Sequence, residues 1–205
     1  CIINRRNRLI VQINDVLCFF SKLDSYTKTK LLYAYCSSFY GSVLWDLQRF
    51  EIQRLCSAWR TALRRVWRVP RNTHCNIVAA LSNRLPLYDE LCNRTINFHY
   101  GCLKSKNCVI RNLANYMMCD EGAQSPHGRN IRFICSEFNL SFSAFSKLTC
   151  HIEVTSFFQR NRYDRLYDFD TSRFNVLLEM LMIKDGVFDL QYFSNDDVEA
   201  NINNI

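Results

Sequence analysis

Arginine is the residue type whose spacing in this chain most strongly indicates chemistry. One segment carries Arg54, Arg60, Arg64, Arg65 and Arg68. At the pitch of an α-helix these side chains fall within one arc, about 140° wide. The positive charges of these arginines repel one another, and Glu51 is the only acid in the segment that could offset them. The arginine face therefore indicates an anionic partner from outside the segment. Phosphate suits it, because a planar guanidinium can donate two parallel hydrogen bonds.

The opposite arc of the same segment is apolar. It holds Ile52, Leu55, Cys56, Trp59, Ala62, Leu63, Val66 and Trp67. This amphipathic pattern predicts a helix over about 49–69 whose apolar face packs in a core while the arginines face outward. The alternative to a phosphate partner is an arginine face that is solvated or paired with acidic residues of the C-terminal part.

Other residues of catalytic type lack the setting that catalysis would need. Asp196 and Asp197 are adjacent, as two-metal phosphoryl transfer could use, but they lie in a polar terminus without a strand–turn–strand frame. His74 and Cys75 lack further ligands at the spacing of a zinc site. The 5 glycines are not grouped into a phosphate loop. We predict no catalytic residue, no metal ligand and no cofactor in this chain.

Composition bounds the class of protein. Hydrophobic residues make up 48% of the 205 residues and charged residues 22%, which allows a packed core. The 11 cysteines are odd in number and form no CxxC pair, which favours reduced, structural thiols and an intracellular protein. No apolar run approaches the roughly 20 residues that span a bilayer, so we expect no membrane partner. The first residue is Cys1, from which we expect a piece of a longer polypeptide.

Charge divides the chain into two parts. Residues 1–118 hold 18 Lys and Arg against 6 Asp and Glu, whereas residues 119–205 hold 8 against 13. A loop at 120–128, with two glycines and Pro126, lies near the change. We therefore predict a basic, nucleic-acid-binding helical domain over 1–118, followed by an acidic accessory tail over 119–205.

The elements that must position the arginines are predicted to be helices. Apolar periodicity, caps and prolines predict helices over about 2–22, 26–47, 49–69, 86–103 and 107–118, and a short one after Asn72 or Thr73. Residues 130–158 are expected to be strand or irregular, and a helix is expected near 172–184. The fold class is thus mainly α, a helical bundle followed by a less regular tail.

An ordered set of short motifs resembles a known family. The set comprises Tyr40-Gly41-Ser42-Val43-Leu44-Trp45-Asp46-Leu47, Ala58-Trp59-Arg60, Ala62-Leu63-Arg64-Arg65-Val66-Trp67, Pro70-Arg71-Asn72-Thr73-His74-Cys75 and Leu85-Pro86-Leu87. Their order and spacing, over residues 5–118, are similar to the region behind the palm in reverse transcriptases of non-LTR retrotransposons, of the jockey-like LINE type.

The resemblance implies a thumb-like domain, which would hold an RNA/DNA template–primer duplex through Arg54, Arg60, Arg64, Arg65, Arg68 and Arg71. Tyr40, Gly41, Trp45, Trp59, Trp67, Pro70 and His74 would be structural motif residues. The upstream palm of the parent polypeptide would carry the catalytic aspartates and Mg²⁺, so this chain alone would be no enzyme. The family also implies nucleus and cytoplasm as the location.

Two alternatives remain open at this stage. The chain could be a degenerate or domesticated remnant that acts as a helical protein-interaction module without nucleic-acid function. Separately, Tyr40 and Trp45, which lie close to Gly41, could be base-stacking residues, although aromatic residues of this kind are more often part of a core.

Overall fold

The computed structural model describes residues 2–73, 75–82, 84–119 and 121–138. All regular secondary structure in these residues is helical, which confirms the mainly α fold class. The α-helices are α1 (Ile2–Phe19), α2 (Ser25–Leu31), α3 (Phe50–Trp67), α4 (Cys75–Leu81), α5 (Leu87–Leu103), α6 (Cys108–Met118) and α7 (Pro126–Glu137). The predicted helix at 172–184 and the Asp196–Asp197 pair lie outside the described residues.

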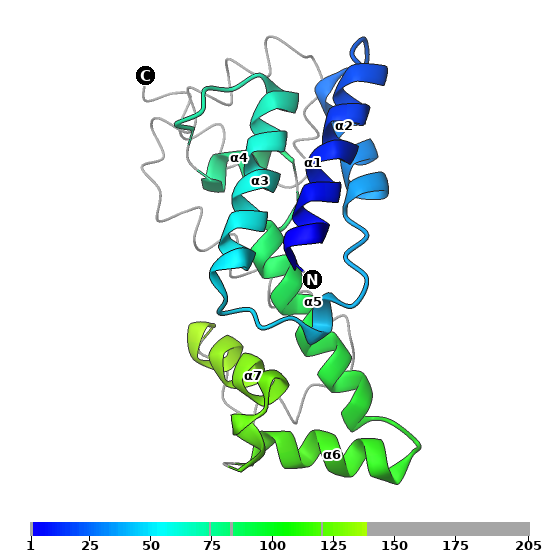
Figure 1. Ribbon diagram of the computed structural model, residues 1–205, viewed down its shortest axis with the longest axis vertical. Coiled ribbons are helices and arrows are strands. Elements are labelled where there is room, and N and C mark those ends of the chain that lie inside the picture. The colour runs from blue at the N-terminus through cyan, green and yellow to red at the C-terminus, as the bar shows by residue number, and fades with distance from the viewer. Residues whose placement is uncertain (1, 74, 83, 120, 139–205) are drawn as a thin grey trace, which may run out of the picture.

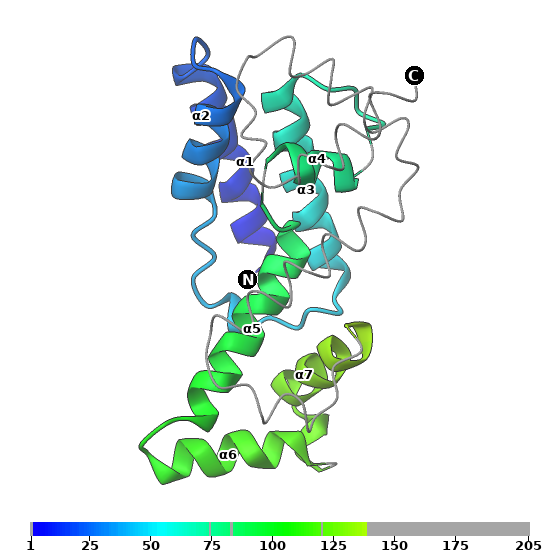
Figure 2. The same ribbon diagram turned by 180° about the vertical axis from the view of Figure 1, so that it is seen from behind.

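The helices form an upper and a lower group, and the long helix α5 belongs to both. In Figures 1 and 2, α1, α2, α3 and α4 form the upper part, and α5 runs down from it to α6 and α7. Trp59 of α3 lies at the centre of the upper core, 1% exposed. Its ring meets Tyr33 edge-on at a centroid distance of 5.0 Å and Phe39 at 6.4 Å, both favourable geometries.

The second predicted helix, over 26–47, is wrong in its C-terminal half. The helix begins within one residue of the predicted start, and Asp24 caps it by accepting a hydrogen bond from the Thr27 N–H at 2.9 Å. After Leu31, however, the helix widens into a π-helical turn, Leu32–Cys36, and the chain then leaves the helix. A short 3₁₀ turn, Ser42–Leu44, follows in the connection to α3.

Two distant arginines hold the chain where this helix ends. Arg5 donates to the Cys36 carbonyl at 2.7 Å, and Arg94 donates to the Ser37 carbonyl at 3.4 Å. Their guanidinium groups also lie 5.1 Å and 5.8 Å from the centroid of the Phe39 ring. Side chains from α1 and α5 thus donate to backbone carbonyls that would have accepted hydrogen bonds within the helix if it had continued. The same two guanidinium groups hold the Phe39 ring through cation–π contacts.

Residues 126–137 are a helix, contrary to the prediction of strand or irregular structure for 130–158. Ser125 caps α7 by accepting from the Gly128 N–H at 3.0 Å, and Pro126 occupies the first turn. Ile131, Ile134, Cys135 and Phe138 join the same core cluster as the helices before them. Helix α7 thus packs against the core of the helices before it, while the domain boundary between residues 118 and 119 stays a prediction.

The glycines of the 120–128 loop serve close packing. A Cβ on Gly122 would lie 2.0 Å from the Tyr116 carbonyl oxygen, and a Cβ on Gly128 would lie 2.5 Å from the Gly122 carbonyl oxygen. Only glycine allows the backbone of this turn to approach so closely. The loop is thus a tight junction between α6 and α7, which is why its composition resembled that of a linker.

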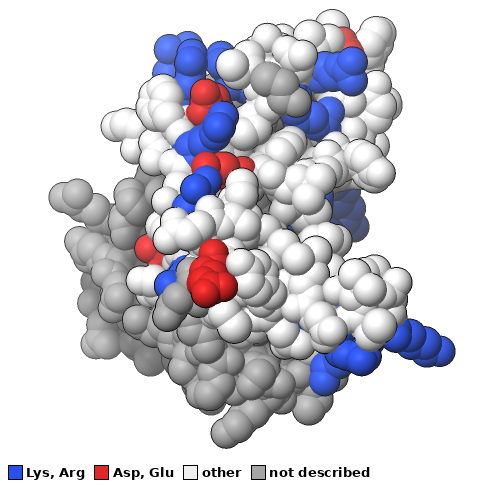
Figure 3. All heavy atoms as spheres, turned by 60° about the horizontal axis from the view of Figure 1, so that its bottom comes forward, with Lys and Arg blue, Asp and Glu red and all other residues white. Residues whose placement is uncertain are grey.

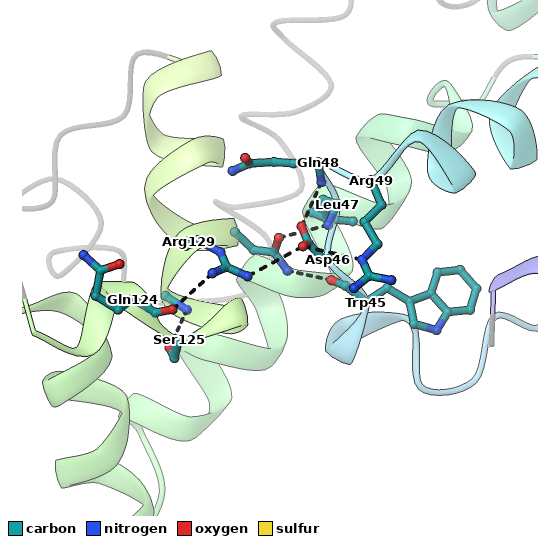
Figure 4. Close-up of polar contacts among 10 residues, drawn as sticks. Trp45, Asp46, Leu47, Gln48, Arg49, Gln124, Ser125 and Arg129 are labelled. Carbon is teal, nitrogen blue, oxygen red and sulfur yellow. Dashed lines mark hydrogen bonds and ion pairs between the residues drawn. The ribbon is translucent and has the colours of Figure 1, made fainter.

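Asn130 of α7 fixes the connection that leads into α3. Its side chain accepts from the Leu47 N–H at 3.0 Å and donates to the Trp45 carbonyl at 2.6 Å. Asp46 between them lies 3.7 Å from the Arg129 guanidinium and 3.8 Å from that of Arg49. Figure 4 shows this junction, in which α7 meets the segment 45–49. Helix α3 is therefore anchored at its N-terminal end by a helix assigned from sequence to the tail.

Candidate nucleic-acid interface

The two faces of α3 are arranged as predicted. All eight residues of the apolar arc are buried: Ile52, Leu55, Cys56, Trp59, Ala62, Leu63, Val66 and Trp67. The helix ends where Arg68 adopts a left-handed conformation, with φ of 54°, and where Val69 N–H donates to the Arg64 carbonyl at 3.1 Å. Because eight side chains fix its orientation, α3 presents its arginines in defined directions.

Arg64 is a structural residue. Its Nε and Nη2 both donate to the Thr73 carbonyl oxygen, at 3.1 Å and 2.6 Å. The guanidinium thereby closes the loop between α3 and α4. This group is only half-exposed and is already engaged. The sequence prediction did not foresee this role, because nothing in the spacing of the arginines reveals a backbone carbonyl nine positions away.

Arg65 and Arg54 are exposed but have neighbours within the chain. Arg65 donates to Asn14 Oδ1 of α1 at 2.8 Å. The Arg54 guanidinium lies 5.9 Å from the centroid of the Phe50 ring. Both contacts lie at the surface and leave donor groups of each guanidinium available to a ligand.

Arg60, Arg68 and Arg71 make no ion pair or side-chain hydrogen bond with any residue that the structure describes. Arg68 and Arg71 are exposed, and Arg60 is half-exposed. The ion pairs in the described ranges join Arg49 and Arg129 to Asp46, and Arg94 to Glu90. None involves the arginine face of α3.

Arg60 lies beside a buried thiol. Burial raises the pKa of Cys56 to about 12, and the positive charge of Arg60 opposes that rise. Burial likewise raises the pKa of Cys36 and of Cys135 to about 11. These thiols are protonated at neutral pH and unreactive, and the cysteines in the described ranges are free. This agrees with the interpretation of the cysteines as reduced and structural.

The motif residues divide into core and surface. Trp59 and Trp67 are buried, Trp45 is half-buried with its ring 6.1 Å from Phe39, and Pro70 is exposed. Gly41 has a φ of 75°, a left-handed conformation that glycine adopts freely. Tyr40 is 99% exposed, so the stacking hypothesis remains open for it, whereas Trp45 is part of the packing. His74 lies outside the described residues.

The lower end of the molecule differs in charge from the arginine face. Figure 3 turns this end forward: most of the described surface in this view is uncharged, and basic and acidic side chains alternate along one side. On α6, Val109, Leu113 and Tyr116 are exposed at 69%, 52% and 48%. This end thus offers an apolar face on α6, beside the exposed basic residues Lys104, Lys106 and Arg111.

A histidine pair joins the lower helices. Nδ1 of His99, on α5, lies 3.2 Å from Nε2 of His127, on α7. Burial, with a smaller contribution from the neighbouring His127, lowers the pKa of His99 to about 4. Burial also lowers the pKa of His127, with the Val43 backbone opposing the shift. Both rings are therefore neutral at neutral pH.

Comparisons of this chain with protein-family models, with curated proteins and with solved structures find no match. In the part that the structure describes, no helix combines the length and the apolarity needed to cross a membrane.

Proposed function

We propose that the helical domain binds the phosphate backbone of a nucleic-acid duplex through the exposed arginines of α3 and of the loop that follows it. The observation that carries the proposal is the combination of a rigidly anchored helix with arginines that lack acidic counterparts among the described residues. Contacts of this kind position a duplex without reading its sequence.

The spacing of the unengaged arginines suits a linear polyanion. Arg54, Arg60 and Arg68 lie along one side of α3, and the helical rise places the first and last about 21 Å apart along the axis. Arg71 extends the series into the next loop. A row of arginines of this length can contact several successive phosphates along one strand of a duplex.

The parent class that we propose is the reverse transcriptase of a non-LTR retrotransposon, on the strength of the motif resemblance in residues 5–118. In that setting the duplex is the RNA/DNA template–primer, and a palm in the same polypeptide supplies the aspartates and Mg²⁺. This chain would then hold the product behind the active site, in the nucleus or cytoplasm, and would perform no chemistry.

The exposed apolar face of α6 favours one other function. Val109, Leu113 and Tyr116 follow each other at helical spacing on a surface that lacks a partner in the described ranges. A helical protein-interaction module, descended from such a polymerase, would use this face. That function predicts no dependence on the arginines of α3.

Binding of an RNA/DNA hybrid over a salt series tests the proposal. If Arg54, Arg60, Arg68 and Arg71 each contact one phosphate, the logarithm of affinity falls with log salt with a slope of about −3.6. Affinity should then drop about a hundredfold between 50 and 200 mM salt. Fluorescence anisotropy of a labelled hybrid measures it. Absence of binding at 50 mM salt, or template-dependent primer extension by the chain alone, would contradict the proposal.

A further inference from the structure

The turn between α1 and α2 displays four apolar side chains to solvent. Phe19 is 80% exposed, Phe20 42%, Tyr26 40% and Leu23 38%. A helix was predicted over about 2–22, but α1 ends at Phe19, and Phe20 follows it as an exposed residue. Exposed aromatic side chains that gather in one place commonly mark a contact surface.

The shape of this turn does not depend on these side chains. Leu23 N–H donates to the Phe20 carbonyl at 3.1 Å, and the buried Lys28 donates through Nζ to the Ser21 carbonyl at 2.8 Å. Asp24 is engaged as the cap of α2. Polar contacts thus hold the turn, and its aromatic side chains are available to a ligand.

The turn lies beside the last turn of α3. Ser25 Oγ donates to the Val66 carbonyl at 3.0 Å, which joins the start of α2 to the end of α3, as Figures 1 and 2 show at the upper end of the molecule. Arg65 and Arg68 are exposed on that part of α3. Lys22 and Lys30 are exposed next to the aromatic residues, and Lys30 Nζ lies 4.3 Å from the centroid of the Tyr26 ring.

We propose that the α1–α2 turn is a stacking platform for unpaired bases of a nucleic-acid strand that continues beyond the duplex held along α3. The inference rests on the proposed function and adds a single-stranded ligand to it. The rings of Phe19, Phe20 and Tyr26 would stack on bases, while Lys22 and Arg65 would neutralise the phosphates between them. Stacking of this kind tolerates any sequence, because every base has a π-face.

Charge favours a nucleic-acid strand over an anionic membrane as the occupant. The basic residues continue from the turn along α3 through Arg60 to Arg54, in a row that suits a linear polyanion continuous with a duplex held on α3.

Binding of paired ligands by the full chain tests the platform. One ligand is a blunt RNA/DNA hybrid, and the other is the same hybrid with a single-stranded extension of about ten nucleotides. We expect the extension to tighten binding about tenfold, as expected from stacking of one or two bases. In the Phe19→Ser/Phe20→Ser variant this gain should disappear, while affinity for the blunt hybrid should stay within about twofold. Val11→Ser is the matched control, because Val11 is an exposed apolar residue of α1 at 59%, away from the turn.

A spectroscopic variant gives a second measurement. In Phe19→Trp, the added indole should be quenched by the extended hybrid but not by the blunt one. The platform is supported if the extension no longer tightens binding in the double serine variant but still does so in Val11→Ser. The platform is overturned if the extension tightens binding equally in the wild type and in the double variant. It is also overturned if the double variant loses binding to anionic phospholipid vesicles but still binds the extended hybrid more tightly than the blunt one. If the blunt hybrid does not bind but a phenylalanine-dependent single strand does, the duplex function fails and the platform stands.

Discussion

Asn130→Ala is expected to lower the free energy of unfolding of the full chain by about 4 kcal/mol, from the cost of about 1–3 kcal/mol for each buried group left unpaired. The substitution leaves the Leu47 N–H and the Trp45 carbonyl without their side-chain partner, in a place where Asn130 is 1% exposed. Water cannot readily replace the amide there. Urea titration followed by circular dichroism measures the change.

Arg129→Ala is the matched control on the same helix. Arg129 is exposed, and its guanidinium lies 3.7 Å from Asp46, so its removal should cost no more than about 0.5 kcal/mol. If Asn130→Ala is as stable as Arg129→Ala, α7 is not anchored to the connection before α3. Such a result would show that the two hydrogen bonds of Asn130 contribute little to the stability of the fold.

Acidification is expected to destabilise the fold before its carboxylates titrate. The pKa of His99 is lowered by burial from its ordinary value to about 4, so the unfolded chain takes up a proton that the folded chain refuses. Stability is fully present above the unfolded pKa of about 6.5 and falls as the pH drops towards 4. The loss should be about 2 kcal/mol by pH 5 and about 3 kcal/mol by pH 4, at about 1.4 kcal/mol per pH unit.

A His99→Gln variant isolates this contribution. Its free energy of unfolding should be lower at neutral pH, because a buried side chain is altered. It should fall less steeply than that of the wild type between pH 6.5 and 5, because only the lowered pKa of His127 then contributes. Urea titrations at a series of pH values give both curves. Parallel curves for wild type and variant would show that His99 is not kept neutral by the junction of α5 with α7.

Helix α3 was predictable from sequence because its signal is local. Hydrophobic residues at helical spacing have to be buried together, and Trp59, Leu63 and Val66 satisfy that requirement within one helix. The N-cap at Asp24 was likewise predictable, since it depends on residues three positions apart. Outward exposure of Arg54 and Arg65 followed from the same periodicity.

Features that depend on distant segments were not predictable in this way. Gly122 and Gly128 have the composition of a linker, and only the nearby backbone of Tyr116 reveals that they permit close packing. The helix that starts at Pro126 was missed because Ser125 and Pro126 fit a turn as well as a capped helix start. Arg64 illustrates the same limit at the candidate site, since its carbonyl partner belongs to another segment.

The salt dependence of hybrid binding, compared between two charge-matched triple variants, tests the central claim most directly. One variant combines Arg54→Gln, Arg60→Gln and Arg68→Gly; glycine suits the left-handed conformation at 68 and should add roughly 1 kcal/mol of stability there, so loss of folding cannot explain loss of binding. The other combines Lys104→Gln, Lys106→Gln and Arg111→Gln, exposed residues around the turn between α5 and α6.

Both variants remove three positive charges, so a general effect of net charge would alter them equally. We predict that the α3 variant flattens the slope of log affinity against log salt by about 2.7, from about 0.9 counterions per lost phosphate contact, while the α5–α6 variant keeps nearly the wild-type slope. Equal slopes for the two folded variants would contradict the account, because the arginines of α3 would then contribute no more than any other surface charge.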